Sequence, residues 1–153
     1  MTERYRDFTV LITKINRNIK RIKTEEMSEF NLRSPHVTCL YYLYKTGGTT
    51  AKELCEIGQE DKATISRSIE HLEKEGYITY ESSQKKKYNT MLTLTTMGNN
   101  IAQKISEKID KIIAIAGGDI SNEKRQIMYE CLAIIDDNLE KICKYYEGEK
   151  YGS

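Results

Sequence analysis

The chain has 153 residues, 39% of them hydrophobic and 31% charged, with a formal net charge of +1. This length suits one domain with one main core, and so many charges favour amphipathic helices that pack against a partner. No apolar run approaches the ~20 residues that span a bilayer, and residues 1–6 begin no signal peptide, so we expect a cytoplasmic protein.

An amphipathic helix is predicted over residues 5–27, because apolar residues recur there at spacings of 4, 3, 4 and 3. The stripe consists of Phe8, Ile12, Ile15, Ile19 and Ile22. Ser34 and Pro35 then match an N-cap followed by proline at the first helical position. The helix that they begin runs to Tyr44 and is apolar on most sides, so we expect it to be the central buried helix.

Two shorter helices, separated by a glycine-bearing turn, are predicted next. Thr50 and Glu53 form a capping box for the first helix, which ends at Gly58. Asp61 can cap the second helix. The inward side chains of the pair are expected to be Leu54, Ile57, Ile65, Ile69 and Leu72. This order of elements predicts a helix-turn-helix, a motif whose second helix reads the major groove of DNA.

A β-hairpin with a charged tip, or wing, follows. Residues 77–80 and 90–94 are rich in strand-forming residues, and residues 81–89 between them are polar and basic. Helical spacing resumes from Thr95 or Thr96 to Ala116, and a last helix starts at Ser121. Its apolar residues Met128, Leu132, Ile135, Leu139, Ile142 and Tyr146 are spaced 4, 3, 4, 3 and 4, and residues 147–153 are expected to fray.

The outer face of the helix at residues 61–75 mixes small residues, hydroxyls and one arginine, which suits entry into a major groove. A lysine run at the wing tip suits phosphates or the minor groove. The candidate DNA-binding residues are Thr50, Lys62, Ala63, Thr64, Ser66, Arg67, Glu70, His71, Lys85, Lys86, Lys87 and Tyr88. The alternative is a solvated face and turn, and the net charge of zero over residues 34–98 does not favour DNA by itself.

Catalytic and metal-binding chemistry finds little support in the sequence. No HExxH, GxSxG or glycine-rich phosphate loop is present, so we expect neither an enzyme nor a cofactor. His36 and Cys39 lie three residues apart and could share a metal, but a structural histidine beside a core cysteine is favoured, and no metal is expected. All four cysteines, Cys39, Cys55, Cys131 and Cys143, are predicted to pack as small hydrophobic residues on or beside helical stripes.

Three segments resemble the MarR/SlyA family of winged helix-turn-helix transcriptional regulators. They are Thr-Ala-Lys-Glu-Leu at 50–54, Asp-Lys-Ala-Thr-Ile-Ser-Arg-Ser-Ile-Glu-His-Leu-Glu-Lys-Glu-Gly-Tyr-Ile at 61–78, and Leu-Thr-Thr-Met-Gly at 94–98. The resemblance implies a homodimer whose N- and C-terminal helices interlock. The implied dimerisation residues are Phe8, Ile12, Ile15, Ile19, Met128, Ile135, Leu139, Ile142 and Tyr146.

The wing departs from the family pattern, which usually carries Asp-x-Arg with the arginine in the minor groove. The matching positions here are Lys86 and Tyr88, so the adjacent lysines are expected to contact phosphate instead. The resemblance also implies a small aromatic effector near His36, Cys39 and Tyr42. The alternative is that these three residues merely pack.

The sequence therefore predicts a mostly α-helical fold with a small β wing, in three parts: an N-terminal dimerisation helix at 1–33, a winged helix-turn-helix lobe at 34–98, and C-terminal dimerisation helices at 99–153. The predicted function is that of a sequence-specific transcription regulator, in the family's commoner mode a repressor. Its dimer would read a pseudo-palindrome in double-stranded DNA, and a small effector would release it. The alternative is a helical dimeric adaptor that binds protein.

Overall fold

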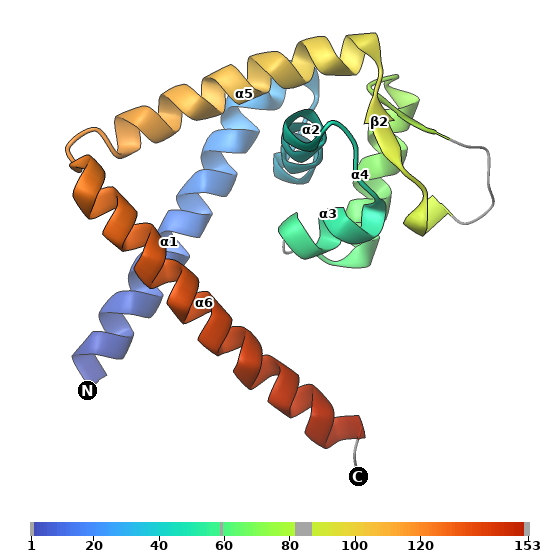
Figure 1. Ribbon diagram of the computed structural model, residues 1–153. Helices are drawn as coiled ribbons and strands as arrows, with labels where there is room; N and C mark the ends of the chain where they lie inside the picture. The colour runs from blue at the N-terminus through green and yellow to red at the C-terminus, as the bar shows by residue number, and fades with distance from the viewer. Residues whose placement is uncertain (1, 59, 82–86, 152–153) are drawn as a thin grey trace. The chain divides into compact units, whose positions relative to one another are not determined.

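The computed structural model describes residues 2–58, 60–81 and 87–151 (Figure 1). The chain divides into two compact units, residues 1–109 and 110–153. The described part is mostly helical with a small antiparallel wing, which confirms the predicted fold class. In chain order the elements are α1 (Thr2–Met27), the 3-10 helix η1 (Ser28–Phe30), α2 (Ser34–Thr46), α3 (Ala51–Gly58), α4 (Lys62–Lys74), β1 (Ile78–Tyr80), the 3-10 helix η2 (Lys87–Asn89), β2 (Leu92–Leu94), α5 (Thr96–Ala116) and α6 (Asn122–Tyr151).

The core of residues 1–109 forms around α2, whose Val37, Cys39, Leu40 and Leu43 are at most 1% exposed. This confirms α2 as the central buried helix. Figure 1 shows α3, α4 and β2 gathered around it. Each buried Leu or Ile stabilises the fold by roughly 1.5–3 kcal/mol. The other buried hydrophobic side chains are Met27, Leu32, Ala51, Leu54, Ile65, Ile69, Leu72, Ile78, Leu92, Ile101, Ala102 and Ile105.

The start of α2 differs by one residue from the sequence prediction. Arg33, not Ser34, is the N-cap, because the N–H of Val37 donates to the carbonyl oxygen of Arg33 at 3.0 Å. The N–H of Arg33 donates in turn to Nδ1 of His36 at 2.9 Å. The imidazole of His36, at the third helical position, thus takes the place of the Glu or Gln side chain of a capping box. Ser34 becomes a buried helical residue.

Helix α3 begins with the predicted capping box, but its C-terminal turn does not bury the residue that was predicted to point inward. The hydroxyl of Thr50 accepts the N–H of Glu53 at 3.2 Å, and Oε2 of Glu53 accepts the N–H of Thr50 at 2.9 Å, which completes the capping box. Ile57, expected to point inward, is 42% exposed. A Cβ on Gly58 would lie 3.3 Å from Cγ2 of Thr38, so the last turn of α3 meets α2 through Gly58 instead.

The wing strands are shorter than predicted. β1 pairs with β2 in antiparallel register, with Ile78 opposite Leu94 and Tyr80 opposite Leu92. Tyr77 is excluded from β1 because its N–H donates to the carbonyl oxygen of Leu72 at 2.9 Å, at the end of α4. Thr49 adds an isolated bridge to the far side of Leu92, so the segment before α3 joins the sheet. Residues 82–86, which include Lys85 and Lys86 of the predicted tip, lie outside the described residues.

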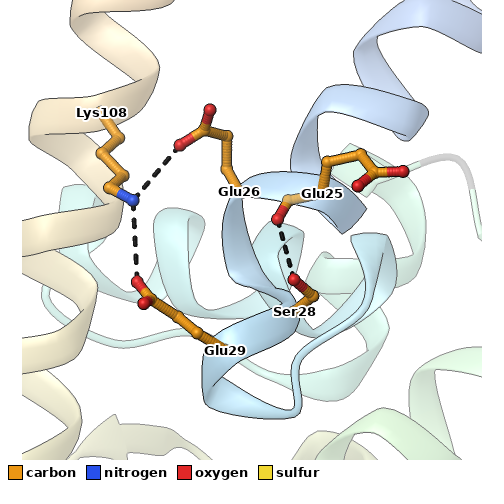
Figure 2. A network of polar contacts seen from close by, with 5 residues as sticks. All are labelled: Glu25, Glu26, Ser28, Glu29 and Lys108. Carbon is orange, nitrogen blue, oxygen red and sulfur yellow. Dashed lines mark hydrogen bonds and ion pairs between the residues drawn. The ribbon is translucent and has the colours of Figure 1, made fainter.

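Polar contacts join α5 to the end of α1 (Figure 2). Nζ of Lys108 lies 3.2 Å from Oε2 of Glu26 and 3.9 Å from Oε1 of Glu29. The hydroxyl of Ser28 donates to the carbonyl oxygen of Glu25 at 3.0 Å where α1 passes into η1. Because the ion-pair side chains are more than 40% exposed, they contribute little to stability. They mark where two elements far apart in sequence meet.

Residues 110–153 comprise the last turns of α5 and the whole of α6. The predicted fraying from residue 147 is wrong, because α6 continues to Tyr151. Cys131 and Cys143 are exposed, so the core prediction fails for them in the single chain. Both lie beside the α6 stripe, which this chain leaves open: Leu139 is 50% and Ile142 49% exposed. None of the described helices is long and apolar enough to cross a membrane.

Candidate nucleic-acid interface

Helix α4 starts on a firm cap. Oδ1 of Asp61 accepts the N–H of Thr64 at 2.7 Å, and Oδ2 accepts the hydroxyl of Thr64 at 2.9 Å. These two hydrogen bonds hold the pKa of Asp61 below its usual value, the backbone N–H contributing most, so the cap is ionised at neutral pH. The predicted N-cap is confirmed. It fixes the first turn of the helix that carries most of the candidate DNA contacts.

The outward face of α4 agrees with the 100° periodicity used to predict it. Ile65, Ser68, Ile69 and Leu72 are buried. Thr64 is half-buried, and its carbonyl oxygen accepts the Ser68 hydroxyl at 2.8 Å. The exposed side chains on the helix include Lys62, Ala63, Ser66, Arg67 and Glu70. This is a face of small and polar groups with one arginine, a composition that a major groove can accept.

Arg67 is oriented by the cap. Its Nη2 lies 3.4 Å from the Thr64 hydroxyl oxygen, which is itself held by Asp61. The guanidinium keeps its other N–H donors available on the exposed face. The two hydrogen bonds that link Arg67 to Thr64 and Thr64 to Asp61 therefore order the one arginine of this face.

His71 does not lie on the exposed face, contrary to its predicted place among the DNA contacts. Its ring stacks on that of His36, with centroids 4.4 Å apart and an angle of 18° between the planes. Nε2 of His71 is buried without a hydrogen-bond partner among the described residues. The N-terminus of α2 packs over this part of α4, and the periodicity of α4 alone does not reveal that contact. The pair joins α4 to the cap of α2.

The stacked pair affects the protonation of His36. Burial, which is the largest cause, and the nearby His71 and Arg33 together lower the pKa of His36 to about 4. The neutral ring is also the one whose Nδ1 accepts the Arg33 N–H. The folded state thus resists protonation of His36 at a pH where the unfolded chain, with an ordinary pKa near 6.5, accepts a proton.

We therefore expect the free energy of unfolding to fall as the pH falls from about 6.5 towards 4, because the unfolded state binds more protons in that window. His36→Gln, which keeps an acceptor for the Arg33 N–H and does not titrate there, should show a smaller decrease. Urea unfolding at several pH values measures both slopes. Equal slopes for the two proteins would contradict the assignment to His36.

A cleft of about 430 Å³ lies between the start of α2 and α4. His36 lines it, together with Arg33, Thr64, Arg67 and His71. Cys39 is completely buried, and burial raises the pKa of its thiol to about 12. Tyr42 is half-buried and does not line the cleft. Of the three residues predicted for an effector, His36 alone lines this cleft.

The predicted contact residues around α3 and the wing have internal partners. The Thr50 hydroxyl caps α3. The Glu53 carboxylate also accepts the Thr49 hydroxyl at 2.6 Å, and this bond and the one from the Thr50 N–H lower the pKa of Glu53. Tyr88 in η2 is half-buried, and Nζ of Lys62 lies 4.4 Å from its ring centroid. The side chains of Lys85, Lys86 and Lys87 lie outside the described set.

Two of these contacts escaped the sequence prediction. The Thr49–Glu53 bond has a local signal, since Thr49 precedes the capping box and shares its carboxylate. The Lys62–Tyr88 contact joins residues 26 positions apart and has none. No cluster of three or more potential metal ligands occurs within the described residues.

Comparison with known proteins finds one matching family model and many solved structures with the same fold. A sequence model of the MarR family matches residues 30–87, from η1 through the described start of η2. No curated protein sequence matches significantly. A MarR family protein from Listeria monocytogenes in complex with a 26mer DNA is 24% identical, with a TM-score of 0.78 over 94% of this chain and 93% of that one.

Two further solved structures have the same fold. A MarR family regulator from Neisseria meningitidis is 20% identical, with a TM-score of 0.74 over 90% of this chain and 96% of that one. MepR from S. aureus, in a DNA complex, is 19% identical, with a TM-score of 0.73 over 86% and 97% of the two chains. The segment that matches the MarR family model contains the helix-turn-helix, and these MarR family structures share the fold of the chain over most of its length.

Proposed function

We propose that the protein is a sequence-specific transcription regulator that binds double-stranded DNA in the cytoplasm, acting as a repressor in the family's commoner mode. The observation that carries this proposal is the exposed face of α4, with Arg67 ordered by the Asp61 cap. Small and hydroxyl side chains allow close approach to the groove, and an arginine fork matches the edge of guanine. Two relatives of the same fold are described as DNA complexes, which supports the proposal.

The proposed binding unit is a homodimer. Apolar residues on α1 and α6 remain open in the single chain: Ile12 is 41%, Ile15 52% and Leu139 50% exposed. Stripes of this kind favour burial against a second copy. A two-fold dimer presents two α4 helices, which suits a pseudo-palindromic site with half-sites about one helical turn apart. The wing of each copy would then reach the adjacent minor groove.

Arg67→Ala is expected to cost ~1–3 kcal/mol of binding free energy per half-site and to relax the preference at one base pair. The preferred site would first be selected from random duplex DNA, and affinities then measured on that site and on single-base variants. Lys74→Ala, an exposed lysine at the far end of the same helix, is the matched control and should leave the base preference unchanged. An equal loss on every sequence would mean that Arg67 contacts phosphate.

A protein-binding adaptor is the competing function, and the zero net charge of residues 34–98 keeps it open. Titration of mixed-sequence duplex DNA at several salt concentrations separates the two. A DNA reader loses affinity steeply as salt rises, because counterions are released from the phosphates, whereas an adaptor does not bind.

The implied effector remains part of the proposal. His36 lines the cleft beside α4, while Cys39 and Tyr42 are held within or beside the core. A ligand there would act by favouring one arrangement of α4 over another. Screening aromatic acids by thermal shift and then by release of DNA tests this role. A protein that none of them stabilises would have no such effector in this chemical class.

A further inference from the structure

Tyr88 is held in place by the protein itself. It lies in η2 at the base of the wing, half-buried, and packs with Cys55 against the main core. Its hydroxyl interacts with the Cys55 side chain of α3. Helix α3 is in turn anchored by the buried Ala51 and Leu54. The Tyr88 ring is therefore held against α3, although Tyr88 lies between β1 and β2 and outside both strands.

Lys62 is held by that ring. It is the first residue of α4 and is exposed, and its ammonium lies 4.4 Å from the Tyr88 ring centroid, within the range of a cation–π interaction. Glu70 and Glu73 line the same small cleft of about 130 Å³. A carboxylate partner would neutralise the lysine, whereas the aromatic face orders it and leaves its charge and its other N–H donors free for an anion.

We propose that Tyr88 is a positioning residue that holds the Lys62 ammonium at the N-terminus of α4 for contact with a DNA phosphate. The inference rests on the proposed DNA-binding function and names a contact within it. A lysine ordered before binding loses less side-chain entropy when it meets the phosphate.

This role differs from the one expected of position 88. The resemblance places a minor-groove arginine at the position of Tyr88. A half-buried tyrosine with its hydroxyl against Cys55 does not extend into a groove. Tyr88 instead links the wing base to the helix that reads DNA, and Lys62 supplies the cation.

The test is a double-mutant cycle on the full chain, with affinity for mixed-sequence duplex DNA measured at several salt concentrations. Tyr88→Leu removes the aromatic face and should weaken binding by about threefold per half-site, the expected size of one exposed cation–π interaction. Tyr88→Phe keeps the ring and should bind like the wild type. Lys62→Met should also reduce the slope of affinity against salt by about one per half-site. In the Lys62→Met background, Tyr88→Leu should have no further effect.

Lys74→Met is the matched control, since it removes one exposed positive charge from the other end of α4 and should change neither the slope nor the effect of Tyr88→Leu. Thermal unfolding of each variant reports whether the wing base remains folded. Additive effects of Tyr88→Leu and Lys62→Met, or a Phe variant as weak as the Leu variant, would overturn the inference while the wild type still bound DNA. A wild type without salt-dependent binding would overturn the proposed function, and this role with it.

Discussion

Gly98→Ala is expected to destabilise the protein by roughly 3 kcal/mol or more, a large fraction of the free energy of unfolding of an ordinary domain. Gly98 lies in the first turn of α5, where its N–H donates to the Thr95 hydroxyl at 3.0 Å. A Cβ on Gly98 would lie 3.0 Å from Cα of Tyr77 and closer still to the Tyr77 carbonyl group. Those atoms are backbone, so no rotamer change relieves the overlap.

The Tyr77 backbone cannot shift away from Gly98, because hydrogen bonds from Thr95 hold the Gly76–Tyr77 segment in place. The Tyr77 carbonyl oxygen accepts the N–H of Thr95 at 3.0 Å, and the Thr95 hydroxyl donates to the carbonyl oxygen of Gly76 at 2.6 Å. Alanine would separate α5 from the end of α4 and break both bonds. Alanine's better helix propensity, worth ~1 kcal/mol over glycine, does not offset this loss.

Gly148→Ala is the matched control, because Gly148 lies on α6 and a Cβ there meets nothing within 4 Å. It should be neutral or slightly stabilising through helix propensity. Urea unfolding of the wild type and both variants gives the free energies. A Gly98→Ala protein with wild-type stability would show that the approach of α5 to Tyr77 is looser than described.

Local signals carried most of the fold prediction. Apolar periodicity located the helices, and the caps at Thr50 and Asp61 depend on atoms no more than three residues away. The start of α2 was misplaced because its cap uses an imidazole, which the usual capping pattern does not include. The first strand was predicted too long because the N–H of Tyr77 bonds to Leu72 instead of a strand neighbour. Propensity does not reveal that competition.

The sequence predicted the part of the candidate site that lies on the single helix α4, but not the contacts that other segments make with it. The 100° step placed Ala63, Arg67 and Glu70 on the exposed face of α4. It failed for His71, since the side chain that covers it, His36, comes from another helix. The stack of His36 on His71 and the contact of Lys62 with Tyr88 exist only once distant segments fold together, so periodicity alone does not predict them.

Leu139→Glu is expected to convert the proposed homodimer into monomers or to unfold it. Leu139 is 50% exposed in the single chain and lies within the α6 stripe, with Ile135 half-buried and Ile142 49% exposed beside it. In a dimer this stripe would be covered by apolar side chains of the second copy. A carboxylate there would lose its water without gaining a partner, which costs several kcal/mol per ion. Two copies would each carry this cost.

Ala133→Glu is the matched control: it adds the same charge to an exposed position of α6, about 140° around the helix from the centre of the stripe. It should leave mass and stability unchanged. Light scattering coupled to gel filtration at micromolar concentration measures the mass, and thermal unfolding measures the stability. The wild type and Ala133→Glu should be dimers, with Leu139→Glu monomeric or unfolded. A stable wild-type monomer would contradict the proposed homodimer. A Leu139→Glu dimer as stable as the wild type would show that the α6 stripe does not form the dimer interface.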